Sequence, residues 1–458
     1  MMNFAGFLLL IGTLFTFHFS LFTSVAEAAP ITYRHKHFLF TIDPALHPEW
    51  HSGSEEWTYN GIPFDPPASW KVDGDTVPPL PVGVDRHAVF SWNRESIRET
   101  IEKIIAKPLR RAPGKVTIQR DAKGDITFEG VGLTGRDVDA DAAAGLTIAA
   151  IQQNLTDIEL PVVETQPEIN VDDPQLVEDG IREVVTIGES TFTGSPVNRR
   201  HNIGVGLRRF NGQLIPAGAE FSFNAVLGKV DGSTGYRLEL VIKGDRTEPD
   251  YGGGLCQIST TAYRGVWEYG FPILKRKNHS YTVRYYAPAG TDATVYPGAV
   301  DMVFKNDLPT SLLIQTYQED DHAYFIYYGT RDTRTTEIVG PFIDDKTPPP
   351  PDKVELTLDL PPGQKKKLNE RVPGQKATWY RFVTSNPPSG TDEKTETVYS
   401  HYEARPLFTA LGVAQLPEGY GSKVIDGEAP VESDAASSVA PVQTSSAARR
   451  GIKPPTRR

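Results

Sequence analysis

Cysteine and excess positive charge are both scarce in this sequence, and each shortage excludes a class of protein. With one cysteine in 458 residues, Cys256, the chain cannot form a disulfide within itself. The net charge of −11 argues against nucleic acid as a partner, because binding phosphate requires basic patches. The ten histidines show no pair at metal-binding spacing on a predicted helix, and no acidic loop has calcium-binding spacing. We therefore expect no metal and no other cofactor.

Long apolar runs are also rare. Only residues 4–24 approach the ~18 apolar residues that a membrane span requires. Ala26-Glu27-Ala28 follows with the small–x–small form of a signal-peptidase site, so residues 1–28 are predicted to be a cleaved signal peptide. Because no Lys or Arg precedes the run, an uncleaved membrane anchor is the alternative. Either way we expect a secreted or extracytoplasmic protein that meets the membrane only through this segment, if it is uncleaved.

The composition and the hydrophobic pattern change once in the first half of the remaining chain. Residues 29–90 are rich in Pro, Gly, Trp and His, which predicts an irregular or short-stranded lead-in. Residues 91–170 then show a helical spacing of isoleucines that Pro108 is expected to end, a hairpin with its turn around Gly124, a second helix and an extended strand. This order indicates a small α+β module.

The second half divides at a proline-rich segment. Residues 195–345 carry the candidate catalytic and binding residues and are expected to form a central mixed α/β domain. TPPPPD within the segment 346–352 predicts a linker, and short alternating strands over 353–414 predict a small β-rich domain. The Ser-, Ala- and Pro-rich stretch 420–458 predicts a disordered tail. The fold class is therefore multidomain α+β.

The lone cysteine follows the most flexible tripeptide of the chain, in YGGGLCQISTT at 251–261. The sequence of Leu255–Tyr269 is typical of a helix, and Gly270 is a signal for its end. Cys256 would therefore lie in the first helical turn. Free backbone N–H groups and the positive end of the helix dipole favour a thiolate at that position. A reactive thiol is therefore one reading of Cys256.

A histidine and an aspartate follow in a suitable order. His279 begins HSYTVRYY, whose alternation predicts a strand, and Asp292 lies in the glycine-flanked AGTDAT. This order resembles that of papain-like and transglutaminase-like thiol enzymes, in which a thiolate attacks, a His takes its proton and a carboxylate orients the His. We predict Cys256, His279 and Asp292 as catalytic residues, with Asp301 as a second candidate for the orienting role.

The residues around the cysteine are the predicted substrate-binding set. Glycines without a Cβ allow a substrate to come close, and Gln257 or the Cys256 N–H could stabilise an oxyanion. The predicted set is Gly252, Gly253, Gly254, Gln257, Ser259 and Thr260. A plainer reading stays open: a buried cysteine, a histidine bonded to backbone and an aspartate in a turn would make a binding module or a scaffold.

Four phrases in fixed order carry a resemblance. FNGQLIPAGAEFSFN, GGGLCQISTT, HSYTVRYY and GTDAT, all within 195–340, resemble the VanW family of glycopeptide (vancomycin) resistance clusters. Upstream, GLTGRDVDADAAAGLTIAAIQ resembles a peptidoglycan-binding module found before several bacterial cell-wall domains. Downstream, LPPGQ, VPGQ and ARPLF resemble a glycine-marked surface domain of cell-wall hydrolases and adhesins.

The resemblance implies a role at the cell envelope with peptidoglycan or another wall polymer as partner. It implies no reaction. Together with the Cys-His-Asp order, it suggests a thiol-dependent peptidoglycan amidase, peptidase or transpeptidase. The alternative is a non-catalytic wall-binding or scaffold protein linked to glycopeptide resistance.

Overall fold

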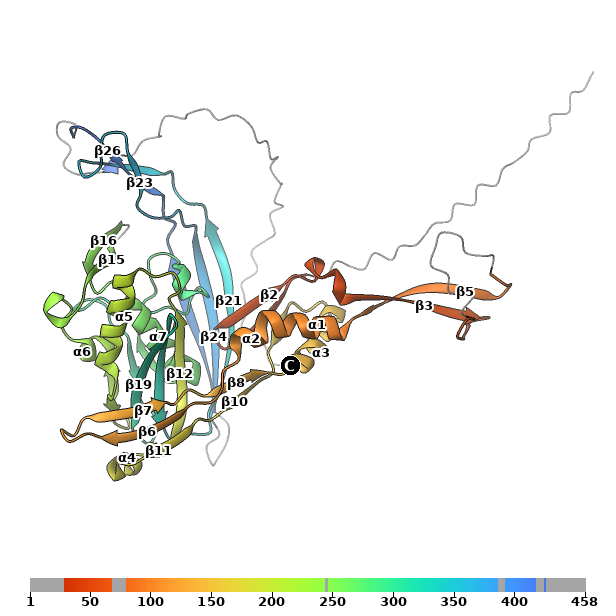
Figure 1. Cartoon of the computed structure of the whole chain (residues 1–458), viewed down its shortest axis with the longest axis horizontal. Coiled ribbons are helices and arrows are strands. Elements are labelled where there is room, and N and C mark those ends of the chain that lie inside the picture. The colour runs from red at the N-terminus through yellow and green to blue at the C-terminus, as the bar shows by residue number, and fades with distance from the viewer. Residues whose placement is uncertain (1–28, 68–79, 244–245, 386–391, 417–423, 426–458) are drawn as a thin grey trace, which may run out of the picture. The chain divides into compact units, whose positions relative to one another are not determined.

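The computed structural model describes residues 29–67, 80–243, 246–385, 392–416 and 424–425 (Figure 1). The predicted signal peptide or anchor at 1–28 lies outside the described residues, as does the predicted tail apart from 424–425. The contacts divide the chain into two compact units. The first comprises Met1–Tyr33, Phe40–Ile101 and Asp141–Ile158, and the second comprises Arg34–Leu39, Glu102–Ala140 and Glu159–Arg458.

The first unit contains strands where an irregular lead-in over 29–90 is expected. β3 (His51–Tyr59) pairs antiparallel with β5 (Val84–Trp92) along its whole length and with the short β4 (Ile62–Pro63). Trp50 is fully buried and donates to Thr100 of α1 (Arg94–Ile101). Strands are the other expectation for this segment. Their length could not be predicted, because β3 is mostly polar and exposed and carries no apolar alternation.

The stretch 91–170 holds most of its predicted elements. β6 (Lys115–Arg120) and β7 (Ile126–Val131) form the predicted hairpin, and the second helix is α3 (Ala140–Gln152). The helical run that begins with α1 ends at Leu109, one residue after Pro108, which lies in its last segment α2 (Lys107–Leu109). The wider turn η4 (Glu102–Ala106) precedes α2.

The extended strand predicted for IELPVVETQPEI is three short strands, each in a different sheet. β9 pairs with β1, β10 with β8, and β11 runs parallel to β6. The prolines that interrupt the apolar pattern separate these strands. Their bounds are Asp157–Glu159 for β9, Val162–Thr165 for β10 and Glu168–Val171 for β11; β1 is Ile31–His35, β2 is Phe38–Ile42 and β8 is Gly135–Val138.

An antiparallel sheet in the order β12-β20-β19-β13 forms the centre of the second unit (Figure 1). Helix α7 (Leu255–Tyr269) packs on β12 so closely that a Cβ on Gly265 would lie 2.5 Å from the Gly188 nitrogen. This contact fixes α7 on the sheet. The other bounds are β12 Glu183–Thr191, β13 Leu214–Ile215, β19 Leu312–Glu319, β20 His322–Gly329 and α5 Val197–Phe210.

Smaller elements surround this centre. β14, β18 and β17 form a three-stranded sheet, and β15 and β16 form a separate hairpin. The short helices α4 and α6 lie at Pro174–Glu178 and Phe223–Leu227. The strands are β14 Glu220–Ser222, β15 Leu238–Lys243, β16 Arg246–Tyr251, β17 Ile273–Lys275 and β18 Val303–Lys305.

Residues after the proline-rich segment share the core of the central region. β21 (Thr335–Thr347) pairs with β24 (Gly374–Ser385), and β24 pairs with β25 (Asp392–Tyr402). Trp379 of β24 is fully buried and packs edge-on against Trp267 of α7, with ring centroids 5.7 Å apart. The sheet thus joins residues on both sides of 346–352, where a boundary before a domain at 353–414 is expected.

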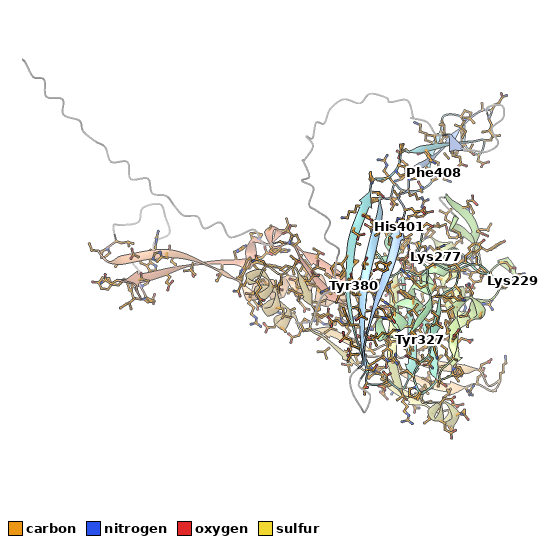
Figure 2. All side chains as sticks on the ribbon, turned by 180° about the vertical axis from the view of Figure 1, so that it is seen from behind. Lys229, Lys277, Tyr327, Tyr380, His401 and Phe408 are labelled. Carbon is orange, nitrogen blue, oxygen red and sulfur yellow. The ribbon has the colours of Figure 1, made fainter. Side chains whose placement is uncertain are left out.

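A second small sheet completes the described chain. Its order is β23-β26-β22-β27, with β22 and β26 parallel. Phe408 of β26 is labelled in Figure 2. The bounds are β22 Lys353–Thr357, β23 Lys365–Lys367, β26 Phe408–Gly412 and β27 Val424–Ile425. The whole is a mixed α+β protein with several sheets, as the sequence predicts.

Candidate functional site

Cys256 lies in the first turn of α7, as the glycine-led helix start predicts. Gly252 and Gly254 have φ angles of 83° and 116°, which side-chain-bearing residues rarely adopt. Every other residue of α7 is buried, and Cys256 alone is partly exposed. The helix is therefore a core element whose only accessible residue is the cysteine.

His279 lies in a loop rather than on the predicted strand. The segment after it forms only the short turn η6 (Arg284–Tyr286). Its Nδ1 lies 2.5 Å from Asp292 Oδ2, and its backbone N–H donates to the same oxygen at 2.8 Å. The ring stacks on Tyr286, with centroids 4.5 Å apart. Because Asp292 occupies Nδ1, Nε2 is the nitrogen left for the Cys256 thiol, and each of these two residues shifts the pKa of the other.

Asp292 is held from three sides. Besides His279, its Oδ1 accepts from Arg276 at 3.2 Å and from the Tyr402 hydroxyl at 2.5 Å. The residue is only 2% exposed. Asp301, the second candidate, instead accepts from Ser222 and from the Asn224 N–H at the start of α6. The structure therefore brings Asp292, and not Asp301, to the histidine.

The electrostatics of the site favour an ion pair. Burial opposes the thiolate, but the hydrogen bond and positive charge of His279 outweigh it and lower the pKa of Cys256 to about 7. Burial also opposes the imidazolium, but the bonds to Asp292 and Cys256 raise the pKa of His279 to about 9. Burial of Asp292 is likewise outweighed by His279 and Arg276, which hold its pKa well below the ordinary value. Between pH 7 and 9 the favoured state is thus thiolate and imidazolium.

Two smaller contacts surround the sulfur. Thr294 Oγ1 lies 3.4 Å from Cys256 Sγ, and the Val295 carbonyl lies 3.6 Å away. A hydroxyl can donate to a thiolate, whereas a carbonyl can only accept from a protonated thiol. Among the described residues, no backbone oxygen accepts a hydrogen bond from the Cys256 N–H. That N–H is the group predicted to face an oxyanion.

Three of the predicted binding residues are fully buried. Gln257 bonds to Arg199 and to Ser190. Ser259 donates to the Ala293 carbonyl at 2.5 Å, and Thr260 accepts from the Ala293 N–H at 3.0 Å. Because Ala293 follows Asp292, these two hydroxyls tie the aspartate loop to the cysteine helix. In this structure they position the site instead of facing a ligand.

The other predicted residues line a cavity of about 690 Å³. Gly252, Gly253 and Gly254 form part of its wall, together with Cys256 and His279. Residues of both strands of the β15–β16 hairpin line it as well, as do Lys229 and Lys277 (Figure 2). Its volume is within the range of pockets that hold small ligands.

Sequence reasoning missed the residues that hold Asp292 and the ring of His279. Arg276 donates to both the carboxylate and the carbonyl of Asp292 and is itself bonded to Ser400. Tyr402 also accepts from the Gly290 N–H at 2.7 Å. Tyr402 and Ser400 lie on β25, far along the chain, so no local pattern could have found them.

The described part of the chain has neither a metal-binding cluster nor a membrane-spanning helix. No group of three or more His, Cys, Asp or Glu side chains there is placed to hold a metal ion. No described helix is long and apolar enough to cross a membrane.

Comparison with known proteins gives partial matches. Residues 198–328 match the family model described as "VanW like protein". The uncharacterized protein YoaR of Bacillus subtilis (strain 168) is 30% identical over 164 residues, which cover 36% of this chain and 52% of that protein. The vancomycin B-type resistance protein VanW of Enterococcus faecalis (strain ATCC 700802 / V583) is 26% identical over 130 residues, covering 27% of this chain and 46% of that protein.

The chain thus spans about half the length of the curated relatives it matches. No solved structure matches it. The peptidoglycan-binding module at 91–170 and the surface domain at 353–414 stay predictions. Residues 198–328, which contain Cys256, His279 and Asp292, are therefore a VanW-like domain, and the likeness to the VanW family rests on this segment.

Proposed function

We propose that this protein is an extracytoplasmic thiol enzyme that acts on an amide bond of peptidoglycan. The observation that carries the proposal is that Cys256 and His279 line one cavity and shift each other's pKa, while Asp292 holds Nδ1 of the histidine. One of the relatives is named as a vancomycin resistance protein, which supports a substrate in the cell wall. The predicted signal peptide supports the location.

The residues supply each part of an acyl transfer. The Cys256 thiolate attacks the amide carbonyl carbon, and the Cys256 N–H is placed to stabilise the oxyanion. When the C–N bond breaks, the His279 imidazolium gives its proton to the leaving amine, and a thioester remains on Cys256. Water or a second amine then attacks the thioester, and His279 takes the proton. Attack by water makes an amidase or peptidase, and attack by an amine makes a transpeptidase.

Asp292 holds the histidine in the tautomer that this chemistry requires. Its carboxylate engages Nδ1 and directs Nε2 to the sulfur. The contacts from Arg276 and Tyr402 keep the carboxylate charged, because they offset the cost of burying it. The imidazolium is thereby stabilised next to the thiolate before any substrate binds.

The test is turnover of soluble disaccharide peptides prepared from peptidoglycan. We expect the purified full chain either to hydrolyse these peptides, giving fragments whose masses sum to that of the peptide plus water, or to cross-link them. Cys256→Ala and His279→Ala should abolish the change in mass. His322→Ala is the matched control, because His322 is exposed on β20. A quenched reaction should carry an acyl mass on Cys256.

Three results would decide against a thiol enzyme. If peptides from several wall types pass unchanged while the chain still binds them, the protein is a wall-binding module. If it neither changes nor binds them, the envelope scaffold is the better account. Equal turnover by the chain and by Cys256→Ala would place the chemistry elsewhere.

A further inference from the structure

Arg199 is a buried cation in the wall of the same cavity. It lies in the first turn of α5, is 8% exposed, and lines the cavity beside Gly254 and Cys256. A Cβ built on Gly254 would lie 3.3 Å from Arg199 Cγ, so the arginine stem packs on the glycine that leads into the nucleophile's helix. Arg199 and the reacting cysteine therefore line the same part of the cavity wall, around Gly254.

The partners of this guanidinium are all uncharged. It donates to Ser195 Oγ at 2.7 Å, to Gln257 Oε1 at 2.9 Å and to the Tyr286 hydroxyl at 3.4 Å. Its Cζ lies over the Tyr285 ring, 4.3 Å from the centroid. No carboxylate of the described residues lies within 4.0 Å of it. Its neighbours thus satisfy some of its donors without neutralising its charge.

Two other buried arginines of the second unit have their charge or their donors satisfied within the protein. Arg381 pairs with Glu396. Arg264 has no carboxylate partner among the described residues either, but four carbonyl oxygens accept from it and it does not line the cavity. A buried charge without a countercharge is costly, so its presence in a cavity wall calls for an anion from outside the chain. The location adds to the effect, because the N-termini of α5 and α7 both reach this cavity and neither has a side-chain cap.

We propose that Arg199 is a specificity-determining residue that binds a carboxylate of the peptide substrate beside Cys256. The proposal rests on the function proposed above and narrows its substrate to peptides with a free carboxylate near the amide that is attacked. Arginine suits this role because its planar donors match a carboxylate.

The rest of the cavity favours a small acid over a polyanion. Glu239 and Asp250 of the β15–β16 hairpin line it too, and they would repel a polymer with many phosphates. Lys277 is exposed at the wall and adds one cation, whereas the other lysine of the wall, Lys229, pairs with Asp231. A volume of about 690 Å³ has room for a short peptide. A peptide with one carboxylate at Arg199 and a neutral or amino-bearing body fits this distribution of charge.

The test compares two alkylating reagents of similar size, one anionic and one neutral. Iodoacetate carries a carboxylate and iodoacetamide does not, and both react with the Cys256 thiolate with loss of iodide. Second-order rate constants are taken on the pH plateau, where the thiol is fully ionised, so that a change in its pKa does not enter. The ratio of the iodoacetate to the iodoacetamide rate constant then reports an anion site beside the sulfur.

We expect Arg199→Gln to lower this ratio about tenfold, since a charge-assisted hydrogen bond is lost. Arg199→Lys should keep part of the preference. Arg200→Gln is the matched control, because Arg200 is the next residue of α5 but pairs with Asp321 outside the cavity wall. An unchanged ratio in folded Arg199→Gln would overturn the proposal.

A measurement on the unmodified chain covers the case in which Arg199→Gln does not fold. N-acetylalanine should slow alkylation of Cys256 by iodoacetamide, while N-acetylalaninamide, its neutral counterpart, should not at the same concentration. Equal effects of the two would overturn the anion site.

These results separate the two proposals. A ratio that depends on Arg199 without any turnover of wall peptides keeps the anion site and refutes the enzyme. Turnover that depends on Cys256 with a ratio independent of Arg199 keeps the enzyme and refutes the anion site.

Discussion

Replacing Asp292 by Asn tests whether the carboxylate is what ionises the cysteine. The amide fills the same space and can still accept from the histidine Nδ1–H, but it carries no charge. Without that charge, burial dominates the titration of His279 and disfavours the imidazolium. The Cys256 thiolate then loses the positive partner that lowers its pKa. We expect the thiol to titrate near its ordinary value.

The size of the effect follows from the two pKa values. In the unmodified chain the pKa of Cys256 is about 7, so half of the thiol is ionised at pH 7. At an ordinary pKa near 9, about 1% is ionised at pH 7, and alkylation slows about fiftyfold. The corresponding free energy is about 2.7 kcal/mol. Above about pH 10 both proteins are fully ionised and should react at similar rates.

The assay is the rate of iodoacetamide addition to Cys256 between pH 5 and 10.5, followed by intact mass. Agreement of the two rates at high pH shows that the cysteine of Asp292→Asn is still accessible and the fold intact. Asp301→Asn is the matched control, because Asp301 bonds to Ser222 and Asn224 and not to the histidine. A midpoint that stays near pH 7 in Asp292→Asn would refute the electrostatic account.

Three further predictions concern the support of the site. Tyr402→Phe should raise the apparent pKa of Cys256 by less than Asp292→Asn does and cost about 1–3 kcal/mol of unfolding free energy, because the Asp292 carboxylate and the Gly290 N–H each lose a buried partner. The same alkylation profile and urea unfolding check both effects. Gly265→Ala should destabilise by about 1–3 kcal/mol because its Cβ meets the Gly188 backbone, although alanine is the better helix former. A Cβ on Gly204 of α5 meets only the ends of the Gln318 and Arg208 side chains, so Gly204→Ala should be nearly neutral, and equal urea midpoints for the two variants would contradict this packing. The raised pKa of His279 gives stability that is complete below about pH 6.5 and is lost as the pH rises through about 9, whereas the lowered pKa of Cys256 gives stability that develops from about 7 to 9. The two nearly cancel in the unmodified chain. Cys256→Ser removes the cysteine effect and keeps the part of the histidine effect that Asp292 supplies, so its urea unfolding should show a steeper loss of stability with rising pH above about 6.5. Parallel curves for the two proteins would count against the pair.

The start of the site could be predicted because its signals are local. Gly254 and Gly270 mark the two ends of α7, and both take positive φ angles that favour glycine, so the predicted bounds Leu255–Tyr269 are confirmed. The alternation after His279 was misleading for a physical reason. Tyr281 and Tyr286 are both buried, but in a loop and a short turn, and burial of alternate aromatics does not by itself require a strand.

Contacts across long sequence separations could not be predicted. The small β-domain expected after the proline-rich segment has the strands that its alternation predicts, yet Trp379 lies in the core of the VanW-like region. Nothing in ATWYRFVT distinguishes a tryptophan that packs on its own strands from one that packs on α7. The same holds for Arg199, whose charge reads as ordinary helix surface until the cavity beside it is known.

The support of Asp292 shows that the site extends beyond the segment that matches the family. Residues 198–328 contain the cysteine, the histidine and the aspartate. They do not contain Tyr402 or Ser400 of β25, which hold Asp292 directly and through Arg276. Burying a carboxylate is costly without such donors, and its negative charge is what raises the pKa of His279. The ionisation of Cys256 therefore depends on a strand that follows the proline-rich segment. Since β25 is held by β24, whose Trp379 packs on α7, the sheet and the cysteine helix form one structural unit with the site between them.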